Sequence, residues 1–200
     1  MALVIGITGG IGGGKTTVCE IFKLLGIPVF EADRISKILL NTNDKLKRKV
    51  SNLFGREVYT EKGDLDSQKL ADIVFNNDTE LAHLNKIVHP EVMGEFLVWL
   101  KQKQHYPYVI LEAAILFESG FHKLTDHIIL VTAPENERIE RVMKRDGVTG
   151  SMVRERVRNQ MPDEKKREMT DIILSNDNKQ LIIPKIIKID KNLKEHGKIC

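Results

Sequence analysis

The chain has 200 residues, of which 42% are hydrophobic and 30% are charged, and its formal net charge is +3. This length suits one mixed domain with small insertions, and the balance excludes an intrinsically disordered chain. The small net charge gives no support for nucleic-acid binding. Residues 138–168 nevertheless hold ten Lys/Arg against six Asp/Glu, and a local excess of this kind indicates either anion handling or a solvated helical face.

Two cysteines, Cys19 and Cys200, fit neither a disulfide framework nor a zinc-ligand spacing, which favours a reducing compartment. The chain opens without the charged and apolar regions of a signal peptide, and no uninterrupted apolar stretch approaches membrane length. We therefore expect a soluble, cytoplasmic protein with no membrane or nucleic-acid partner, either a monomer or a weak oligomer.

The first predicted strand, Leu3–Thr8, leads into a glycine-rich run from Gly9 to Thr16 that fits G-x-x-x-x-G-K-[ST]. This pattern is typical of a P-loop, whose backbone N–H groups face phosphate oxygens while the next helix, here Lys15–Leu25, directs its positive end at them. We expect Lys15 to reach the β- and γ-phosphates of ATP and the Thr16 hydroxyl to bind Mg²⁺. The predicted nucleotide-binding residues are Gly10, Ile11, Gly12, Gly13, Gly14, Lys15, Thr16 and Thr17.

A second short strand, Ile27–Phe30, is followed by the carboxylates of Glu31 and Asp33. From Ile35 to about Gln104 the periodicity becomes helical with polar breaks. Four helices are predicted in this stretch: Asp44–Phe54, Asp66–Phe75, Thr79–Val88 and Pro90–Gln104. Pro90 is expected to begin a helix because proline is favoured in a first turn.

Three more strands are predicted beyond this helical stretch: Tyr108–Leu111, Ile128–Thr132 and Ile172–Leu174. The helices among and after them are Pro134–Arg145, a basic helix through Asn159, a short helix from Pro162 and a terminal helix in which Pro184 is a candidate kink. The alternation predicts a five-stranded parallel sheet with helices on both faces. Ligands of such sheets bind beyond the carboxyl ends of the strands, which is where the P-loop, Asp33 and Glu112 fall.

Three classes of P-loop protein compete for this chain: a phosphotransferase, a GTPase switch and a mechanical or regulatory ATPase. The guanine-reading string N-K-x-D and the switch string D-x-x-G are both missing from the sequence, which argues against a GTPase. The apolar strand that would serve an ATPase ends in Glu112 rather than in Asp, so that class is weaker. A small kinase needs an acceptor-binding insertion, a basic lid and a base, and the helical stretch, the Arg-rich helices after Pro134 and Asp33 fit these needs.

Several motifs together resemble dephospho-coenzyme A kinase. They are Thr8-Gly9-Gly10-Ile11-Gly12-Gly13-Gly14-Lys15-Thr16-Thr17, Glu31-Ala32-Asp33, Leu84-Asn85-Lys86-Ile87-Val88-His89-Pro90, Ile115-Leu116-Phe117-Glu118, Arg141 with Arg145-Asp146, Asn159-Gln160 and Asp171-Ile172-Ile173-Leu174-Ser175-Asn176. They stand in the family's order and extend to about Asp177. The resemblance implies ATP-dependent phosphorylation of the ribose 3′-hydroxyl of dephospho-coenzyme A, the last step of coenzyme A synthesis. Another P-loop nucleoside or nucleotide kinase is the alternative, and a non-kinase regulatory ATPase is the least favoured.

The resemblance also implies a P-loop kinase core in residues 1–34, 106–135 and 166–200, a coenzyme A domain in 35–105 and a lid in 136–165. Asp33 is expected to accept the proton of the acceptor hydroxyl, with a helix N-cap as its bland alternative. Arg141 matches the family's lid arginine and Asn176 its adenine contact, although Asn176 also suits an ordinary turn. His89 and Glu118 are candidate substrate contacts, or else a helix-boundary residue and a capping partner.

Other charged residues are expected to be solvated. Arg138 shares a helical face with Arg141 and Arg145 by spacing, but a solvated face explains it at least as well, and the run Lys165-Lys166-Arg167 is more typical of solvent exposure than of a site. Three departures from the family's pattern are present: Gly13 and Thr16 stand where Ser is usual, Glu31 replaces a frequent Asp, and Ala113-Ala114 replaces an apolar-Pro pair.

Overall fold

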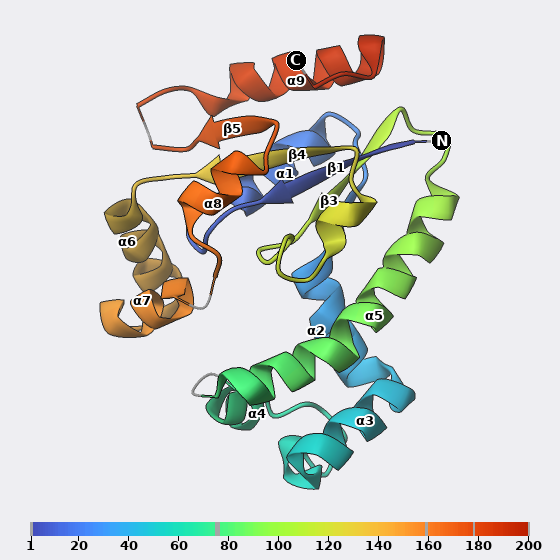
Figure 1. The fold of residues 1–200 in the computed structure, drawn as a ribbon, viewed down its shortest axis with the longest axis vertical. Helices are drawn as coiled ribbons and strands as arrows, with labels where there is room; N and C mark the ends of the chain where they lie inside the picture. The colour runs from blue at the N-terminus through green and yellow to red at the C-terminus, as the bar shows by residue number, and fades with distance from the viewer. Residues whose placement is uncertain (1, 75–76, 159, 178, 200) are drawn as a thin grey trace. The chain divides into compact units, whose positions relative to one another are not determined.

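The computed structural model describes residues 2–74, 77–158, 160–177 and 179–199 (Figure 1). The chain divides into two compact units, one made of Met1–Glu31 with Leu100–Cys200 and the other of Ala32–Trp99. The expectations that involve Phe75, Asn159 and Cys200 lie outside the described residues. In the described part of the chain, no helix is both long enough and apolar enough to cross a membrane.

The first unit is built on a five-stranded sheet, as predicted. Its strands are β1 (Leu3–Thr8), β2 (Val29–Glu31), β3 (Tyr108–Glu112), β4 (His127–Thr132) and β5 (Ile172–Ser175). They lie in the order β2-β3-β1-β4-β5, and each neighbouring pair is parallel. All five carboxyl ends therefore meet at one edge, and the central strand β1 delivers the P-loop there.

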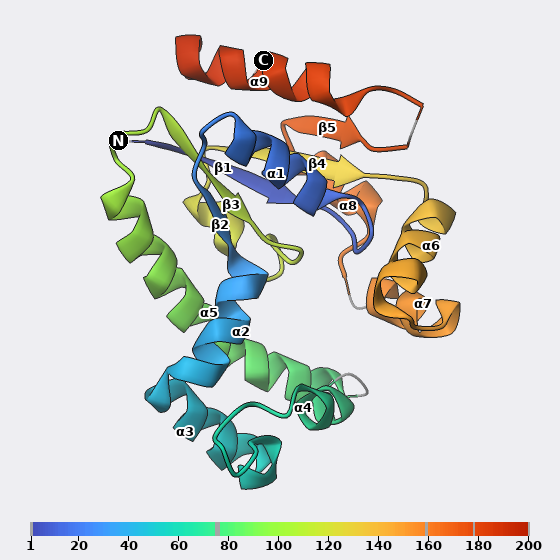
Figure 2. The same cartoon turned by 180° about the vertical axis from the view of Figure 1, so that it is seen from behind.

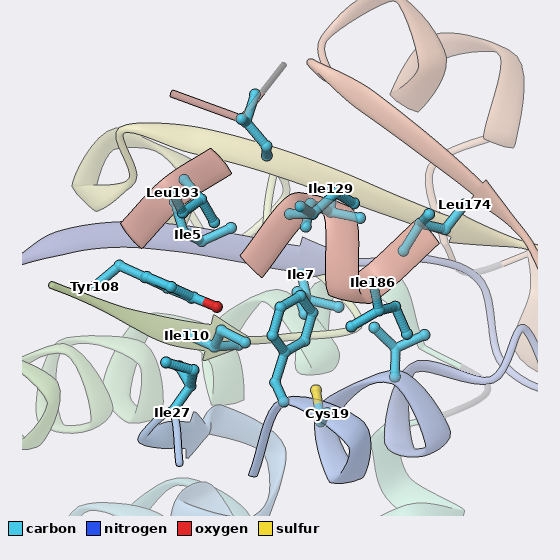
Figure 3. Close-up of a cluster of buried hydrophobic side chains, with 14 of the residues drawn as sticks. Ile5, Ile7, Cys19, Ile27, Tyr108, Ile110, Ile129, Leu174, Ile186 and Leu193 are labelled. Carbon is cyan, nitrogen blue, oxygen red and sulfur yellow. The ribbon is translucent and has the colours of Figure 1, made fainter. Parts of the chain in front are cut away.

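Helices cover both faces of this sheet. On one face α1 (Lys15–Leu24) and α9 (Ile182–His196) pack against the strands, with Ile7, Phe22 and Ile186 fully buried between the layers (Figure 3). Figures 1 and 2 show α8 (Asp163–Glu168) on the opposite side of the sheet, where it contacts β4. Burial of these apolar strands on both faces is the arrangement that a parallel sheet requires.

A buried hydrogen bond joins the sheet to the terminal helix. Tyr108 on β3 is fully buried, and its Oη donates to Oδ1 of Asp190 on α9 at 2.6 Å. Lys194 donates to the other oxygen of the same carboxylate at 3.0 Å, so the buried charge has both a hydrogen bond and an ion pair. Pro184 occupies the first turn of α9, where its missing N–H removes no intrahelical bond, and the predicted kink is not needed.

The remaining helices of this unit follow β4. They are α6 (Glu135–Asp146) and α7 (Gly150–Arg158). A short 3₁₀ turn, η2 (Phe121–Leu124), lies before β4. Ile139 and Val142 of α6 pack against Val153 of α7 in a small core of their own. Gly147 ends α6 with a positive φ of 68°, which makes the sharp turn between these two helices possible.

The second unit contains α2 (Ala32–Thr42), α3 (Asp44–Phe54), the 3₁₀ turn η1 (Arg56–Val58), α4 (Ser67–Val74) and α5 (Asp78–Gln102). The expected break at Pro90 is wrong, because α5 is one helix with this proline inside it. Val88, Val92 and Phe96 are all buried at a spacing of four residues, so packing on both sides of Pro90 keeps the helix continuous. The proline removes one backbone hydrogen bond, and Figure 1 shows α5 bending part-way along.

Candidate active site

The P-loop connects β1 to α1 through a backbone that needs glycine. Gly9 has φ +151° and Gly14 has φ +101°, conformations that side-chain-bearing residues rarely adopt. A Cβ atom on Gly9 would overlap the backbone carbonyl of Val131, and one on Gly14 would overlap the side-chain amide of Asn176. The loop is therefore held closely between β4 and the segment after β5.

The start of α1 presents the groups that are predicted to bind phosphate. Gly14 is the N-cap and offers no side chain to the first-turn N–H groups, and no acidic residue stands in that turn. Thr16 and Thr17 are exposed there, and Lys15 folds back so that Nζ donates to the carbonyl of Gly9 at 2.9 Å. A helix N-terminus with unclaimed N–H groups, a lysine and two hydroxyls is well suited to a triphosphate.

Arg141 and Asn176 hold the outer side of the loop. Arg141 Nη2 donates to the carbonyl of Asn176 at 2.8 Å and to Glu137 Oε2 at 3.0 Å, while Nη1 reaches the carbonyl of Gly12 at 3.5 Å. Asn176 Nδ2 donates in turn to the carbonyl of Gly13 at 3.2 Å. The structure thus brings three groups of predicted site residues together: the P-loop, the α6 arginine and the asparagine after β5.

Two carboxylates stand at the carboxyl edge of the sheet beside the P-loop. Glu31 on β2 is directly opposite Glu112 on β3, and Lys23 forms an ion pair with Glu31. Burial raises the pKa of the Cys19 thiol, and the charges of Glu112 and Glu31 raise it further, while Lys15 opposes them. The charges of Glu31, Glu112 and Lys15 therefore all act on Cys19, a buried residue of α1.

Thr16 and Glu112 have side-chain oxygens that fit a magnesium ion. Mg²⁺ takes oxygen ligands and is typically held by one or two protein oxygens together with substrate phosphates rather than by a complete protein cage. The hydroxyl of Thr16 and the carboxylate of Glu112 supply such oxygens at the sheet edge that carries the P-loop. In the described residues no three His, Cys, Asp or Glu side chains gather as a metal cluster.

Asp33 and His89 lie near each other in the second unit. Asp33 is exposed in the first turn of α2, which begins one residue earlier, so it is not the N-cap that was its alternative. His89 lies inside α5, so its interpretation as a helix-boundary residue is wrong. Burial lowers the pKa of His89 below its usual value, and the nearby Asp33 carboxylate acts in the opposite direction.

Glu118 is in the turn region after β3, in the first unit. Its Oε1 accepts a hydrogen bond from the backbone N–H of Met161 at 2.8 Å and lies 3.9 Å from Lys166 Nζ. The expectation that Lys166 is solvated is wrong, since its side chain is 0% exposed. The short helix α8 packs on β4, so one side of it faces the protein interior. Lys166 lies on that side, while Lys165 and Arg167 face solvent.

The solvated interpretation of Arg138 is wrong as well. This residue is 5% exposed, and its Nη1 lies 2.9 Å from Oδ2 of Asp163, an oxygen that also accepts from Thr132 at 3.1 Å. A Cβ on Gly10 would overlap the Arg138 guanidinium, so this buried arginine packs directly on the P-loop. Among the arginines predicted to share a face, Arg145 is the exposed one and pairs with Asp146.

Gln160 is a further contact that residue patterns alone did not assign to the loop. Its Oε1 accepts a hydrogen bond from the N–H of Ile11 at 3.0 Å. The segment after α7 is therefore tied to the first turn of the P-loop. The only sequence signal for this contact was that Gln160 falls in one of the motifs that resemble the kinase family.

The chain matches known proteins over nearly its whole length. The sequence profile of the dephospho-CoA kinase family, CoaE, matches residues 3–181. A dephospho-CoA kinase of Bacteroides fragilis is 36% identical over 189 residues, which cover 94% of this chain and 92% of the relative. The chain belongs to the dephospho-CoA kinase family. The nucleotide-binding roles of the P-loop, Arg141 and Asn176 stay predictions for this member of the family.

Two solved structures have folds similar to that of this chain. A crystal structure from Thermus thermophilus superposes with a TM-score of 0.80 at 34% identity, covering 94% of this chain and 95% of the other. A dephospho-CoA kinase from Campylobacter jejuni superposes with a TM-score of 0.72 at 24% identity, covering 99% of this chain and all of the other. The second likeness shows the fold alone.

Proposed function

We propose that this chain transfers the γ-phosphoryl group of ATP to the ribose 3′-hydroxyl of dephospho-coenzyme A. The observation that carries the proposal is the P-loop, with Lys15 and the uncapped start of α1, in a chain whose family profile spans residues 3–181. The α1 N-terminus and Lys15 favour phosphate charge in the ground state and in the transition state alike. The family match supports the identity of the acceptor, and the P-loop geometry supports phosphoryl transfer.

Phosphoryl transfer depends on positioning and on charge neutralisation more than on covalent chemistry. Lys15 and the loop amides would hold the β- and γ-phosphates, and Arg141 would add positive charge from α6. Thr16, with Glu112 at the same sheet edge, would hold Mg²⁺, which would supply charge neutralisation for the phosphates. Asn176, which is hydrogen-bonded to both Gly13 and Arg141, is the proposed adenine contact.

Asp33 is the proposed base. Its carboxylate would accept the proton of the 3′-hydroxyl as that oxygen forms a bond to the γ-phosphorus and the bond to the β-phosphate oxygen breaks, which leaves ADP. It follows the end of β2 by two residues and is exposed, so its carboxylate is available to a ligand. His89, near Asp33 in the same unit, is the proposed neighbour on the acceptor side.

A ligand-induced stability measurement tests the acceptor. Dephospho-coenzyme A added without ATP should raise the melting temperature by selective binding to the folded state, and AMP at the same concentration should raise it far less. The 68-residue second unit, Ala32–Trp99, is larger than a base and a sugar-phosphate require, which is why we expect it to recognise the pantetheine arm. Equal shifts from the two ligands would favour a nucleotide kinase instead.

A further inference from the structure

Lys166 is a fully buried lysine of the first unit. It lies on α8 between two exposed residues, Lys165 and Arg167, and its own side chain is 0% exposed. Its Nζ is buried and has no hydrogen-bond partner within the described residues. An ammonium carries three donors, and burying all of them unpaired is unfavourable unless another group compensates the charge.

The two neighbouring carboxylates do not compensate it fully. Glu118 Oε1 is 3.9 Å from Lys166 Nζ, beyond hydrogen-bond distance, and already accepts the N–H of Met161 at 2.8 Å. Asp163 uses its Oδ2 to accept hydrogen bonds from Arg138 at 2.9 Å and from Thr132 at 3.1 Å. One oxygen of each carboxylate is therefore already engaged by other donors.

Two cations of the P-loop and of the helix packed on it, Lys15 and Arg138, influence the charge of Lys166. Burial lowers the pKa of the Lys166 ammonium below its ordinary value; the charges of Glu118 and Asp163 raise it, and those of Lys15 and Arg138 lower it. Lys15 is the P-loop lysine, and Arg138 packs on Gly10 of the same loop. Three cations thus share the surroundings of the loop, so an anion bound there would relieve their mutual repulsion.

We propose that Lys166 is a positioning residue for the nucleotide, supplying from the protein interior a fixed positive charge that favours and orients the phosphate groups bound at the P-loop. A charge in this low-dielectric position is weakly screened and acts over a longer range than a solvated lysine such as Lys165. The inference deepens the proposed function and takes from it the identity of the anion, a nucleoside triphosphate. It does not depend on which acceptor the enzyme uses.

Inorganic tripolyphosphate is the probe that tests this role, because it carries the phosphate charge without the adenine or the acceptor. Lys166→Met keeps the shape and apolar stem of the side chain and removes its charge, and Lys165→Met is the matched control on the same helix. We expect Lys166→Met to weaken tripolyphosphate binding, measured by calorimetry, by about 10- to 100-fold, because one weakly screened positive charge is removed. Lys165→Met should bind as the unmodified protein does.

The melting temperature without ligand separates this role from a structural one. A nucleotide-positioning Lys166 predicts that Lys166→Met melts at the same temperature as the unmodified protein or higher, since a buried unpaired charge is lost. Tripolyphosphate binding within about twofold of the unmodified protein would overturn the proposal. If the methionine variant does not fold, the same titration on Lys166→Gln decides, with the same two outcomes. Failure of the unmodified protein to phosphorylate dephospho-coenzyme A would overturn the proposed acceptor and leave this result standing.

Discussion

Arg141 donates a hydrogen bond from Nη2 to the backbone carbonyl of Asn176 at 2.8 Å, and Asn176 donates from its side-chain amide to the carbonyl of Gly13. Arg141 on α6 is thereby hydrogen-bonded to the segment after β5, and that segment is hydrogen-bonded to the P-loop. Since α6 and β5 are brought together only by the fold, this connection makes the geometry of the phosphate site depend on segments far apart in the sequence.

The first prediction concerns this arginine. Arg141→Ala removes a cation and three hydrogen bonds beside the P-loop, and we expect kcat/KM for ATP to fall by about 10²–10³-fold. Arg145→Ala is the control, because Arg145 is exposed on the same helix and pairs with Asp146. Steady-state kinetics of the two variants compare them directly. Equal losses in both would mean that Arg141 has no special part in nucleotide binding.

The second prediction concerns the proposed base. Asp33→Asn should leave ATP affinity nearly unchanged and lower turnover by about 10²–10⁴-fold, the usual contribution of a general base. Asp78→Asn is a matched control, since Asp78 occupies the first turn of α5 as Asp33 occupies the first turn of α2. If turnover of Asp33→Asn stays within a few-fold of the unmodified protein, Asp33 serves only the helix.

The third prediction is a pH dependence of stability. Burial lowers the pKa of folded His89, so the unfolded chain binds more protons as pH falls below about 6.5, the usual histidine value. The stability that His89 contributes is therefore complete above that pH and is lost as pH decreases toward the folded pKa. Melting temperatures between pH 8 and pH 5 should fall less steeply in His89→Gln than in the unmodified protein.

His83 provides the control for that experiment. Its side chain is 49% exposed on the same helix, beside Glu80, and its replacement by Gln should leave the slope of melting temperature against pH close to that of the unmodified protein. Parallel slopes for His89→Gln and the unmodified protein would show that burial of His89 does not influence folding between these pH values.

The sequence predicts the sheet well because its signals are local. Each strand is a short apolar run, and the glycine pattern from Gly9 to Lys15 specifies both a turn and the helix that follows it. The break expected at Pro90 fails for a tertiary reason, since buried residues on both sides of the proline keep α5 continuous. Local preference was outweighed there by packing.

Buried charges are the part of the site that patterns do not reveal. Arg138 and Lys166 lie in charged, hydrophilic segments that are typical of solvated helices, and only the fold shows that both face inward and that Arg138 packs on the P-loop. Their charged partners come from other segments of the chain: Arg138 pairs with Asp163, 25 residues away in sequence, and Lys166 lies beside Glu118, which follows β3. No window of local sequence contains that information.

The most direct test of the account is the product formed from ATP and dephospho-coenzyme A. The protein is incubated with Mg-ATP and either dephospho-coenzyme A or a nucleoside monophosphate, and the products are separated and the phosphate position is assigned by ³¹P and ¹H NMR. The account predicts coenzyme A, with the new phosphate on the ribose 3′-oxygen, and little phosphorylation of the monophosphates. Efficient phosphorylation of a nucleoside monophosphate, with dephospho-coenzyme A left unchanged, would contradict it.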